Sequence, residues 1–311
     1  MIYTVTLNPA IDKTVTVSNL SLGAVNRVET VREDAGGKGI NVSKCLKALG
    51  ADSVAVTLLA GQGGERLLHL MEQEKLTVLW EKAQGQTRTN LKIIDPVQGR
   101  NTDINEPGHR ATVEILNTLL DRLCQSVTAG DIAVLSGSLP AGAPVDTYRV
   151  WTERLHNIGV TVLLDADGAC MAEGLKACPD LIKPNETELS RLLNKPLETE
   201  EMCLAAGKEL QKAGISRVVI SMGGDGALFL FPNQNYRAGS LSVPVQSTVG
   251  AGDSMVAAMA YGLEKNLPET EMIRLAMAMG AASVMQSGSQ APAADLVQSL
   301  AIQVTPEAIA I

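Results

Sequence analysis

The sequence predicts an α/β protein with a mostly parallel central sheet, helices on both faces of that sheet and a small four-stranded β lid. Continuously apolar segments such as 54–59 and 160–164 alternate with segments of helical periodicity, which is typical of parallel strands buried under crossover helices. Two β-rich stretches, about residues 13–33 and 87–106, interrupt this alternation and are expected to form the lid. Polar and glycine-rich positions recur directly after the predicted strands, where open α/β sheets bind ligands.

The N-terminal part of the chain predicts three strands and then a helix. Ile2–Leu7 reads as a strand that stops at an Asn-Pro turn signal. Thr14–Val17 and Val25–Val31 read as two further strands. No helix fits between these three strands, so a small antiparallel unit is expected here. Val42–Leu49 has helical spacing and stops at a glycine.

The rest of the chain alternates between the two kinds of element. The predicted strands are 54–59, 77–80, 89–94, 102–105, 132–135, 160–164, 181–182, 217–221 and 227–231. The predicted helices are 65–74, 112–127, 145–157, 186–193, 200–213, 254–264 and 269–285. A Gln-Gly-Arg turn joins the strands 89–94 and 102–105 into a hairpin of the lid. We find no repeat, low-complexity segment or linker, so the prediction is a single domain, residues 1–311, with a lid.

Composition excludes several classes of protein. The five cysteines are scattered and form no CxxC pair, which favours a reducing compartment over a disulfide framework or a zinc site. The sequence shows no signal peptide and no apolar run long enough to span a membrane, so a cytoplasmic protein is expected. A net charge of −8 and 3% aromatic residues argue against a nucleic-acid partner.

The stretch Ser247-Thr-Val-Gly-Ala-Gly-Asp253 is the strongest single candidate for a functional site in the sequence. Gly250 and Gly252 allow unusual backbone angles and place no side chain between backbone and ligand. Unpaired N–H groups at the start of the helix that follows would attract an anion. Asp253 then suits a general base beside bound phosphate, although aspartate in this position is also a common N-cap.

Several common catalytic and nucleotide-binding motifs are absent from the sequence. The sequence contains no GxxxxGK[ST], no GxGxxG after a strand, no GxSxG and no HExxH, so the usual signals of P-loop, dinucleotide-binding, hydrolase and zincin sites are missing. The remaining polar residues at strand ends include Asp12, Ser138 and Lys183. None is specific alone, and Asp12 could equally cap a turn.

Taken together, five motifs in order resemble the PfkB family of sugar kinases, within the ribokinase-like fold. They are Asn8-Pro-Ala-Ile-Asp12, Ala35-Gly-Gly-Lys-Gly-Ile-Asn41, Ser136-Gly-Ser-Leu-Pro140, Lys183-Pro-Asn-Glu-Thr-Glu188 and the Ser247–Asp253 stretch. The resemblance covers essentially the whole chain. It implies a general-base role for Asp253, with the backbone N–H groups of Gly250, Ala251 and Gly252 holding the transferred phosphoryl group.

The resemblance also implies a substrate side of the site. Asp12 would hold sugar hydroxyls, while Arg88 and Arg27 on the lid would bind the phosphate that the substrate already carries, because a guanidinium engages phosphate oxygens bidentately. Both arginines are otherwise read as solvated lid charges. The substrate-side residues implied are Asp12, Gly37, Lys38, Asn41, Arg88, Arg27 and Ser138.

On the nucleotide side, the resemblance implies ATP as co-substrate with Mg²⁺. Asn185 and Glu188 match an Asn-x-x-Glu motif that would hold the ion, largely through water; a glutamate here is otherwise a solvated first-turn acid. The nucleotide-side residues implied are Lys183, Asn185, Ser221, Gly223 and Gly226. Without the family, the stretch 223–226 reads as a hairpin turn.

Within the family, the chain resembles the 1-phosphofructokinases and the tagatose-6-phosphate kinases. Thr87-Arg-Thr-Asn-Leu-Lys92 and Thr102-Asp-Ile-Asn105 favour the first group. This implies phosphoryl transfer from ATP to O6 of fructose 1-phosphate. The alternative is transfer to the C1 hydroxyl of tagatose 6-phosphate or of fructose 6-phosphate. A possible monovalent cation, lid closure over the sugar phosphate and a homodimer through the exposed lid face are further expectations.

Overall fold

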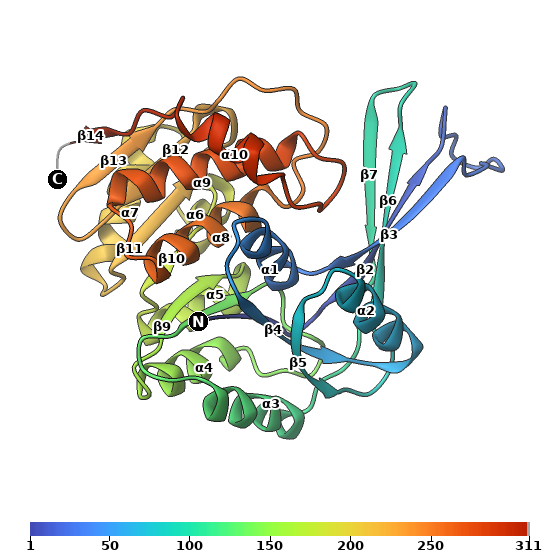
Figure 1. Ribbon diagram of the computed structural model, residues 1–311, viewed down its shortest axis with the longest axis horizontal. Helices are drawn as coiled ribbons and strands as arrows, with labels where there is room; N and C mark the ends of the chain where they lie inside the picture. Colours follow the sequence, from blue (N-terminus) through green and yellow to red (C-terminus); the bar gives the residue numbers. More distant parts are fainter. Residues whose placement is uncertain (310–311) are drawn as a thin grey trace.

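The computed structural model describes residues 1–309 and is built on a central ten-stranded sheet (Figure 1). The strand order is β14-β13-β12-β11-β10-β9-β8-β1-β4-β5. From β11 to β5 neighbouring strands are parallel, whereas β12, β13 and β14 are antiparallel. The strands are β1 (Ile2–Thr6), β4 (Ser53–Leu59), β5 (Thr77–Lys82), β8 (Ile132–Ser136), β9 (Thr161–Asp165), β10 (Leu181–Ile182), β11 (Arg217–Ser221), β12 (Ala227–Leu230), β13 (Asn235–Ala238) and β14 (Glu307–Ile309).

Helices cover both faces of this sheet, as the sequence predicts. One face is covered by α1 (Lys38–Ala48), α8 (Ala251–Glu264), α9 (Glu269–Val284) and α10 (Ala294–Ala301). The other face is covered by α3 (Val113–Ser126), α4 (Thr147–His156), α5 (Gly168–Gly174), α6 (Glu186–Leu193) and α7 (Glu200–Lys212). The helix α2 (Gly61–Gln73) packs Leu67 and Met71 against Ile11 in a smaller cluster. Thr112 and Thr199 each accept a backbone N–H bond, which fixes the starts of α3 and α7.

A second sheet of four strands stands to one side of the main body (Figure 1). Its order is β3-β2-β6-β7, where β2 is Ala10–Thr16, β3 is Thr30–Gly36, β6 is Arg88–Asp95 and β7 is Arg100–Asn105. β2 and β6 are parallel, and the two outer pairs are antiparallel. The prediction of four strands supplied by two separate segments is therefore confirmed.

Details of the N-terminal prediction were wrong. The strand expected at Val25–Val31 lies at Thr30–Gly36, because pairing with β2 runs from Thr16–Thr30 to Ala10–Gly36. Val25 is 84% exposed in the loop before this strand, so its apolar pattern is not a buried strand face. The first predicted strand, β1, belongs to the central sheet instead of a small antiparallel unit.

Several short elements of the fold give little signal in the sequence. The strands β13 and β14 and the helices α5 and α10 were not predicted. Each has eight residues or fewer, so its periodicity gives little signal. Of the helices between residues 1 and 309, none has the length and apolarity to cross a membrane.

Candidate active site

Three adjoining cavities lie along the edge where parallel strands end and the second sheet begins. We call them the apolar cavity, of about 380 Å³, the charged cavity, of about 390 Å³, and the side cavity, of about 360 Å³. Ser221 and Gly252 line both the apolar and the charged cavity. Lys38 and Arg88 line both the charged and the side cavity. The three cavities therefore form one continuous groove, with the charged cavity in the middle.

The N-terminus of α8 forms one wall of the charged cavity. Gly250 is the N-cap residue with φ +82°, a left-handed angle that favours glycine. A Cβ on Gly252 would lie 3.0 Å from Nζ of Lys183, so the turn leaves space for the lysine beside the first N–H groups of the helix. These N–H groups and the neighbouring cations Lys183 and Lys38 form an anion-binding wall.

Asp253 lies in the first turn of α8 and is 6% exposed. Its Oδ2 accepts a 2.8 Å hydrogen bond from Nδ2 of Asn41, on α1. Burial raises the pKa of Asp253, and the charge of Asp165 adds to that, while Lys38, Asn41 and Lys183 act in the opposite direction. A carboxylate with a raised pKa that faces an anion site is suited to accept a proton from a hydroxyl.

A buried charge cluster lies beneath Asp253. Asp165 ends β9 and is 2% exposed. Both of its oxygens are 3.2 Å from Nζ of Lys38, and Oδ1 is 3.9 Å from Nζ of Lys183. Burial would raise the pKa of Asp165, but the two lysines hold it below its usual value. Burial alone would lower the pKa of Lys38, and the acidic groups around it, led by Asp165, raise it instead.

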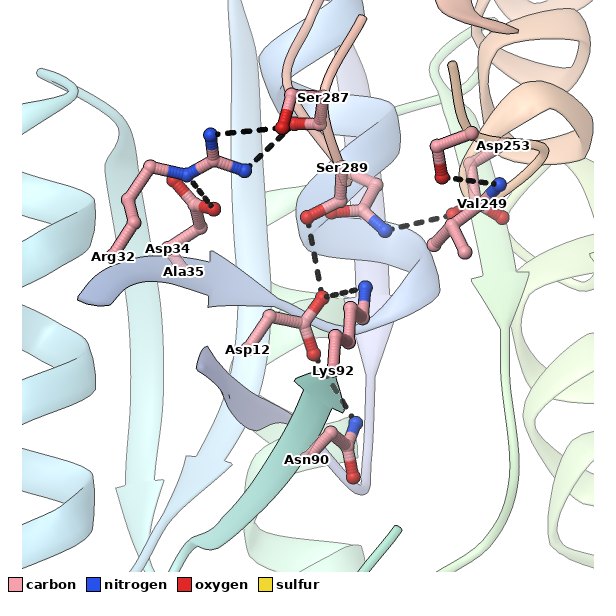
Figure 2. Close-up of polar contacts among 12 residues, drawn as sticks. Asp12, Arg32, Asp34, Ala35, Asn90, Lys92, Val249, Asp253, Ser287 and Ser289 are labelled. Carbon is pink, nitrogen blue, oxygen red and sulfur yellow. Dashed lines mark hydrogen bonds and ion pairs between the residues drawn. The ribbon is translucent and has the colours of Figure 1, made fainter. Parts of the chain in front are cut away.

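On the opposite wall, Asp12 is held by three side chains (Figure 2). Its Oδ2 accepts from Nζ of Lys92 at 2.9 Å and from Oγ of Ser289 at 3.2 Å, and its Oδ1 accepts from Nδ2 of Asn90 at 3.2 Å. A Cβ on Gly36 would lie 2.5 Å from the Asp12 carboxyl carbon, so the neighbouring strand must have glycine here. Asp12 was expected just past a strand end, but it lies inside β2, where pairing with both neighbours fixes it.

The side cavity is lined by the cations Arg88 and Lys38, the amide of Asn8 and the hydroxyl of Ser138. Arg88 begins β6 and donates from Nη2 to the carbonyl of Asn8 at 2.9 Å and from Nη1 to the carbonyl of Glu106 at 3.2 Å. Nδ2 of Asn8 in turn donates to Oγ of Ser138 at 3.3 Å. These bonds fix Arg88 and Ser138 on either side of one hollow.

The apolar cavity is lined mainly by side chains of α8, α9 and the segment before α8. Gly223 and Gly226 lie on its wall, and Gly223–Asp225 forms a 3₁₀ turn inside the loop that joins the antiparallel strands β11 and β12, so the stretch is a hairpin connection as well as part of the cavity. The apolar lining residues are Leu241, Val243, Val245, Met255, Met277, Ala281 and Val284. An apolar cavity next to an anion-binding helix end has the polarity for a nucleotide base joined to phosphates.

Asn185 and Glu188 form a capping box at the start of α6. Oδ1 of Asn185 accepts from the backbone N of Glu188 at 2.8 Å, and Oε2 of Glu188 accepts from the backbone N of Asn185 at 2.9 Å. The glutamate is thus more than a solvated first-turn acid, and its other oxygen is outside this pair. Among the residues that the structure describes, no three His, Cys, Asp or Glu side chains gather as a metal site.

The structure brings almost every predicted site residue to this groove. The predicted residues that line it are Asp12, Gly37, Lys38, Asn41, Arg88, Ser138, Lys183, Asn185, Glu188, Ser221, Gly223, Gly226, Gly250, Ala251, Gly252 and Asp253. Arg27 is the exception. It lies in the exposed loop before β3 and lines none of the three cavities.

Several residues of the groove were not predicted from the sequence. Asn90 and Lys92 share a face of β6 with Arg88, and their spacing of two residues was the available signal. Asp165 was recognised only as the end of a strand. Ser289 lies in a loop with no motif, so nothing in the sequence marked it. Asp103 and Asn105 also line the charged cavity from β7.

Comparison with known proteins identifies the family. Residues 5–296 match the family model described as "pfkB family carbohydrate kinase". The chain belongs to the PfkB family. The resemblance drawn from the five motifs is thereby confirmed, and the groove described above is the candidate active site of a PfkB carbohydrate kinase.

Several relatives of this chain within the PfkB family are phosphofructokinases. The 1-phosphofructokinase of Xanthomonas campestris is 41% identical over 88% of this chain and 88% of its own length. The 1-phosphofructokinase of Haemophilus influenzae is 37% identical over 92% and 91%. The structure of phosphofructokinase-2 from Escherichia coli in complex with potassium is 30% identical, with a TM-score of 0.93 over 97% of this chain and 98% of that one. Another structure of that enzyme is described as its tetrameric inhibited form, with a TM-score of 0.91 over the same shares at 30% identity.

Proposed function

We propose that this PfkB kinase is an ATP-dependent 1-phosphofructokinase, which transfers the γ-phosphate of ATP to O6 of fructose 1-phosphate and gives fructose 1,6-bisphosphate and ADP. One observation supports this most directly. The charged cavity lies between the α8 N-terminus with Asp253 and the cation Arg88, so a hydroxyl and a phosphate of one substrate can bind at its two ends. Phosphofructokinase relatives support the same assignment.

Buried polar atoms around the charged cavity support a polar ligand. Oδ1 of Asn41, Oδ1 of Asn90 and Nε of Arg88 are buried and have no hydrogen-bond partner within residues 1–309. Native proteins seldom leave such atoms unpaired, so we propose that a bound ligand or water supplies their partners when the site closes. Donors and acceptors both occur in this set, which suits sugar hydroxyls together with a phosphate.

Transfer would take place at the start of α8. The nucleotide base would occupy the apolar cavity, and the N–H groups of Gly250, Ala251 and Gly252 would stabilise the charge on the transferred phosphoryl group. With Oδ2 of Asp253 held by Asn41, Oδ1 remains to take the proton of the attacking hydroxyl. Ser221 lines both of these cavities, and Lys183 lines the charged cavity beside Gly252.

The substrate would lie across the charged cavity with its phosphate in the side cavity. Asp12, fixed by Lys92 and Asn90, presents a carboxylate to sugar hydroxyls, and Gly37 lines the same cavity. Arg88 and Ser138 would hold the existing phosphate, and Lys38 adds positive charge where the two cavities meet. The second sheet carries Asp12 and Arg88, so we propose that it acts as a lid which closes on the bound sugar phosphate.

Mg²⁺ fits the donors present near the phosphates. Glu188 lines the charged cavity and has one oxygen outside its capping box, and Mg²⁺ is usually held by one or two carboxylates together with waters and substrate phosphates. Bound there, the ion would offset charge on the nucleotide phosphates. A monovalent cation is also proposed, on the ground that the related Escherichia coli structure contains potassium.

The decisive assay measures ADP release with MgATP against four sugars. We expect fructose 1-phosphate to give the highest kcat/KM, and free fructose to be poor because Arg88 and Ser138 would have no phosphate to bind. Tagatose 6-phosphate or fructose 6-phosphate as the preferred substrate would transfer the assignment to the C1-hydroxyl kinases of the family. No ADP release with any of the four would contradict a phosphofructokinase.

The protein is proposed to form a homodimer through the second sheet. Val31 on β3 and Ile104 on β7 are 57% and 54% exposed, and Leu22 and Val25 in the loop between β2 and β3 are 94% and 84% exposed. An exposed apolar patch on a sheet with open edges favours pairing with a second copy. Sedimentation at micromolar concentration should give a dimer, and Ile104→Asp should shift it to monomer. A monomeric wild-type protein would contradict the proposal.

A further inference from the structure

The segment Gln286–Gln290, which follows α9, contacts both walls of the charged cavity. We call it the clasp segment. Figure 2 shows Ser287 meeting Arg32 of the second sheet, and Ser289 meeting Asp12. The residues of each pair are 255 and 277 positions apart in the chain, so these bonds join parts of the fold that are distant in sequence.

Arg32, on β3, supplies the first connection. Its Nη2 donates to the carbonyl of Ser287 at 2.7 Å, its Nη1 to Oγ of Ser287 at 3.2 Å and its Nε to Oδ2 of Asp34 at 2.8 Å. Gly288 has φ +74°, and a Cβ there would lie 2.7 Å from Nη2 of Arg32. The backbone of the clasp segment therefore packs directly under the guanidinium, in a conformation that favours glycine.

Ser289 supplies the second connection and reaches both walls. It is 5% exposed, and its Oγ donates to Oδ2 of Asp12 at 3.2 Å. Its Cα lies 3.8 Å from the position of a Cβ on Gly250, the N-cap of α8. One buried serine thus bonds to the carboxylate on the sugar side and lies next to the turn on the phosphoryl side.

The end of α9 is tied to the same turn. The carbonyl of Val284 accepts hydrogen bonds from the backbone N of Gln246 at 2.7 Å and of Ser247 at 3.2 Å. Residues 246 and 247 lead directly into Gly250. A shift of the clasp segment would therefore be transmitted to the start of α8 through both backbone and side-chain contacts.

We propose that the clasp segment couples the second sheet to the phosphoryl-binding turn, with Arg32 and Ser289 as positioning residues for the reaction. When the second sheet lies over the cavity, Arg32 holds Ser287, and Ser289 fixes the spacing between Asp12 and Gly250. Loss of Arg32 frees the clasp segment and loosens the turn that binds the transferred group. The coupling rests on the proposed function only for its kinetic consequences.

The test compares Arg32→Ala with matched variants by amide hydrogen exchange and by kinetics. We expect Arg32→Ala to speed exchange by about tenfold or more at residue 286 and at residues 246, 247 and 254, whose hydrogen-bonded amides flank the turn. We also expect the KM for the sugar phosphate to rise about tenfold, because hydrogen bonds from a charged donor are lost. Ser289→Ala should reproduce the faster exchange at 246, 247 and 254 with a smaller change at 286. Arg32→Lys, which lacks the forked donor, should lie between wild type and Arg32→Ala.

Two controls separate this coupling from general effects of charge or folding. Asp34→Asn removes the ion pair with Arg32 but keeps both bonds to Ser287, so exchange at 246, 247 and 254 should stay as in wild type. Arg100→Ala removes an exposed arginine from β7 of the same sheet and should change neither reading. Thermal melting checks that each variant is folded.

Unchanged exchange at 246, 247 and 254 in both Arg32→Ala and Arg32→Lys would overturn the proposal. So would an Asp34→Asn variant that matches Arg32→Ala, since charge alone would then explain the effect. If the wild-type protein phosphorylates no sugar phosphate, the proposed function fails, while the exchange rates still decide whether the coupling exists.

Discussion

Replacing Asp253 with asparagine should lower kcat by about 10²- to 10⁴-fold while leaving the KM for the sugar phosphate nearly unchanged. Asparagine has the same shape and can still meet Asn41, but it cannot take the proton of the attacking hydroxyl. Asp12 and Arg88, which we propose bind the sugar phosphate, line the same cavity and are not altered. Steady-state kinetics with MgATP and the preferred sugar phosphate would measure both constants.

The pH dependence gives the same residue a second test. Burial raises the pKa of Asp253 above its ordinary value of 3.8, and the base works only when it is deprotonated. In wild type, kcat should therefore fall as the pH drops through that raised pKa, and the asparagine variant should lose this acid limb. Asp295→Asn, which changes an exposed aspartate in the first turn of α10, is the matched control and should behave as wild type. A variant at position 253 that keeps kcat within threefold would remove the general-base role.

Replacing Asp165 with asparagine should lower the free energy of unfolding by about 3 kcal/mol. Removing one partner of a buried ion pair costs roughly 3–5 kcal/mol, because the remaining charge is left buried and unpaired. Here Lys38 and Lys183 would both lose their carboxylate, but the Lys38 side chain is 35% exposed, which favours the low end of that range. Denaturant unfolding with an unchanged m-value would measure the loss.

Two variants make this second prediction specific. Asp121→Asn removes an exposed aspartate that pairs with Arg154 at 2.8 Å, and it should cost less than about 1 kcal/mol. Combining Asp165→Asn with Lys38→Met should restore part of the stability, because one unpaired charge disappears. The pKa of Asp165 is lowered in the folded protein, so its contribution is complete above about pH 3.8 and is lost as the pH falls through the folded-state pKa. A loss of under 1 kcal/mol at neutral pH would show that the cluster is solvated.

Much of the candidate site was predictable because its residues lie in short segments with their own local physics. Gly250 adopts φ +82° and Gly252 leaves space for Lys183. Glycine meets both requirements, so the two glycines mark this turn in the sequence. Parallel strands place their carboxyl ends on one edge, so Asp165 and Lys183 were bound to lie near the α8 turn once the strand alternation was recognised. The alternation of apolar strands and amphipathic helices likewise determined the layers of the fold.

Other features depend on contacts between distant segments and leave no local pattern. The apolar residues Val25 and Val28 looked like a strand, but register with β2 places β3 at Thr30–Gly36, where polar side chains face the site. Ser289 has no motif around it, and its value comes only from lying between Asp12 and Gly250. Arg27 matched a family position, yet the loop that carries it extends away from the groove.

The sequence by itself determined the α/β layers, the presence of a four-stranded second sheet and the residues of the two glycine-rich turns, through hydrophobic periodicity, backbone freedom and unpaired N–H groups at a helix start. The PfkB family came from the resemblance of five motifs. The tertiary structure alone decided the position of β3, the ion pairs of Asp165 with Lys38 and Lys183, the support of Asp12 by Lys92 and Ser289, and the clasp between Arg32 and Ser287. These contacts form between residues far apart in the chain, and their partners are chosen by packing, which no single stretch of sequence records.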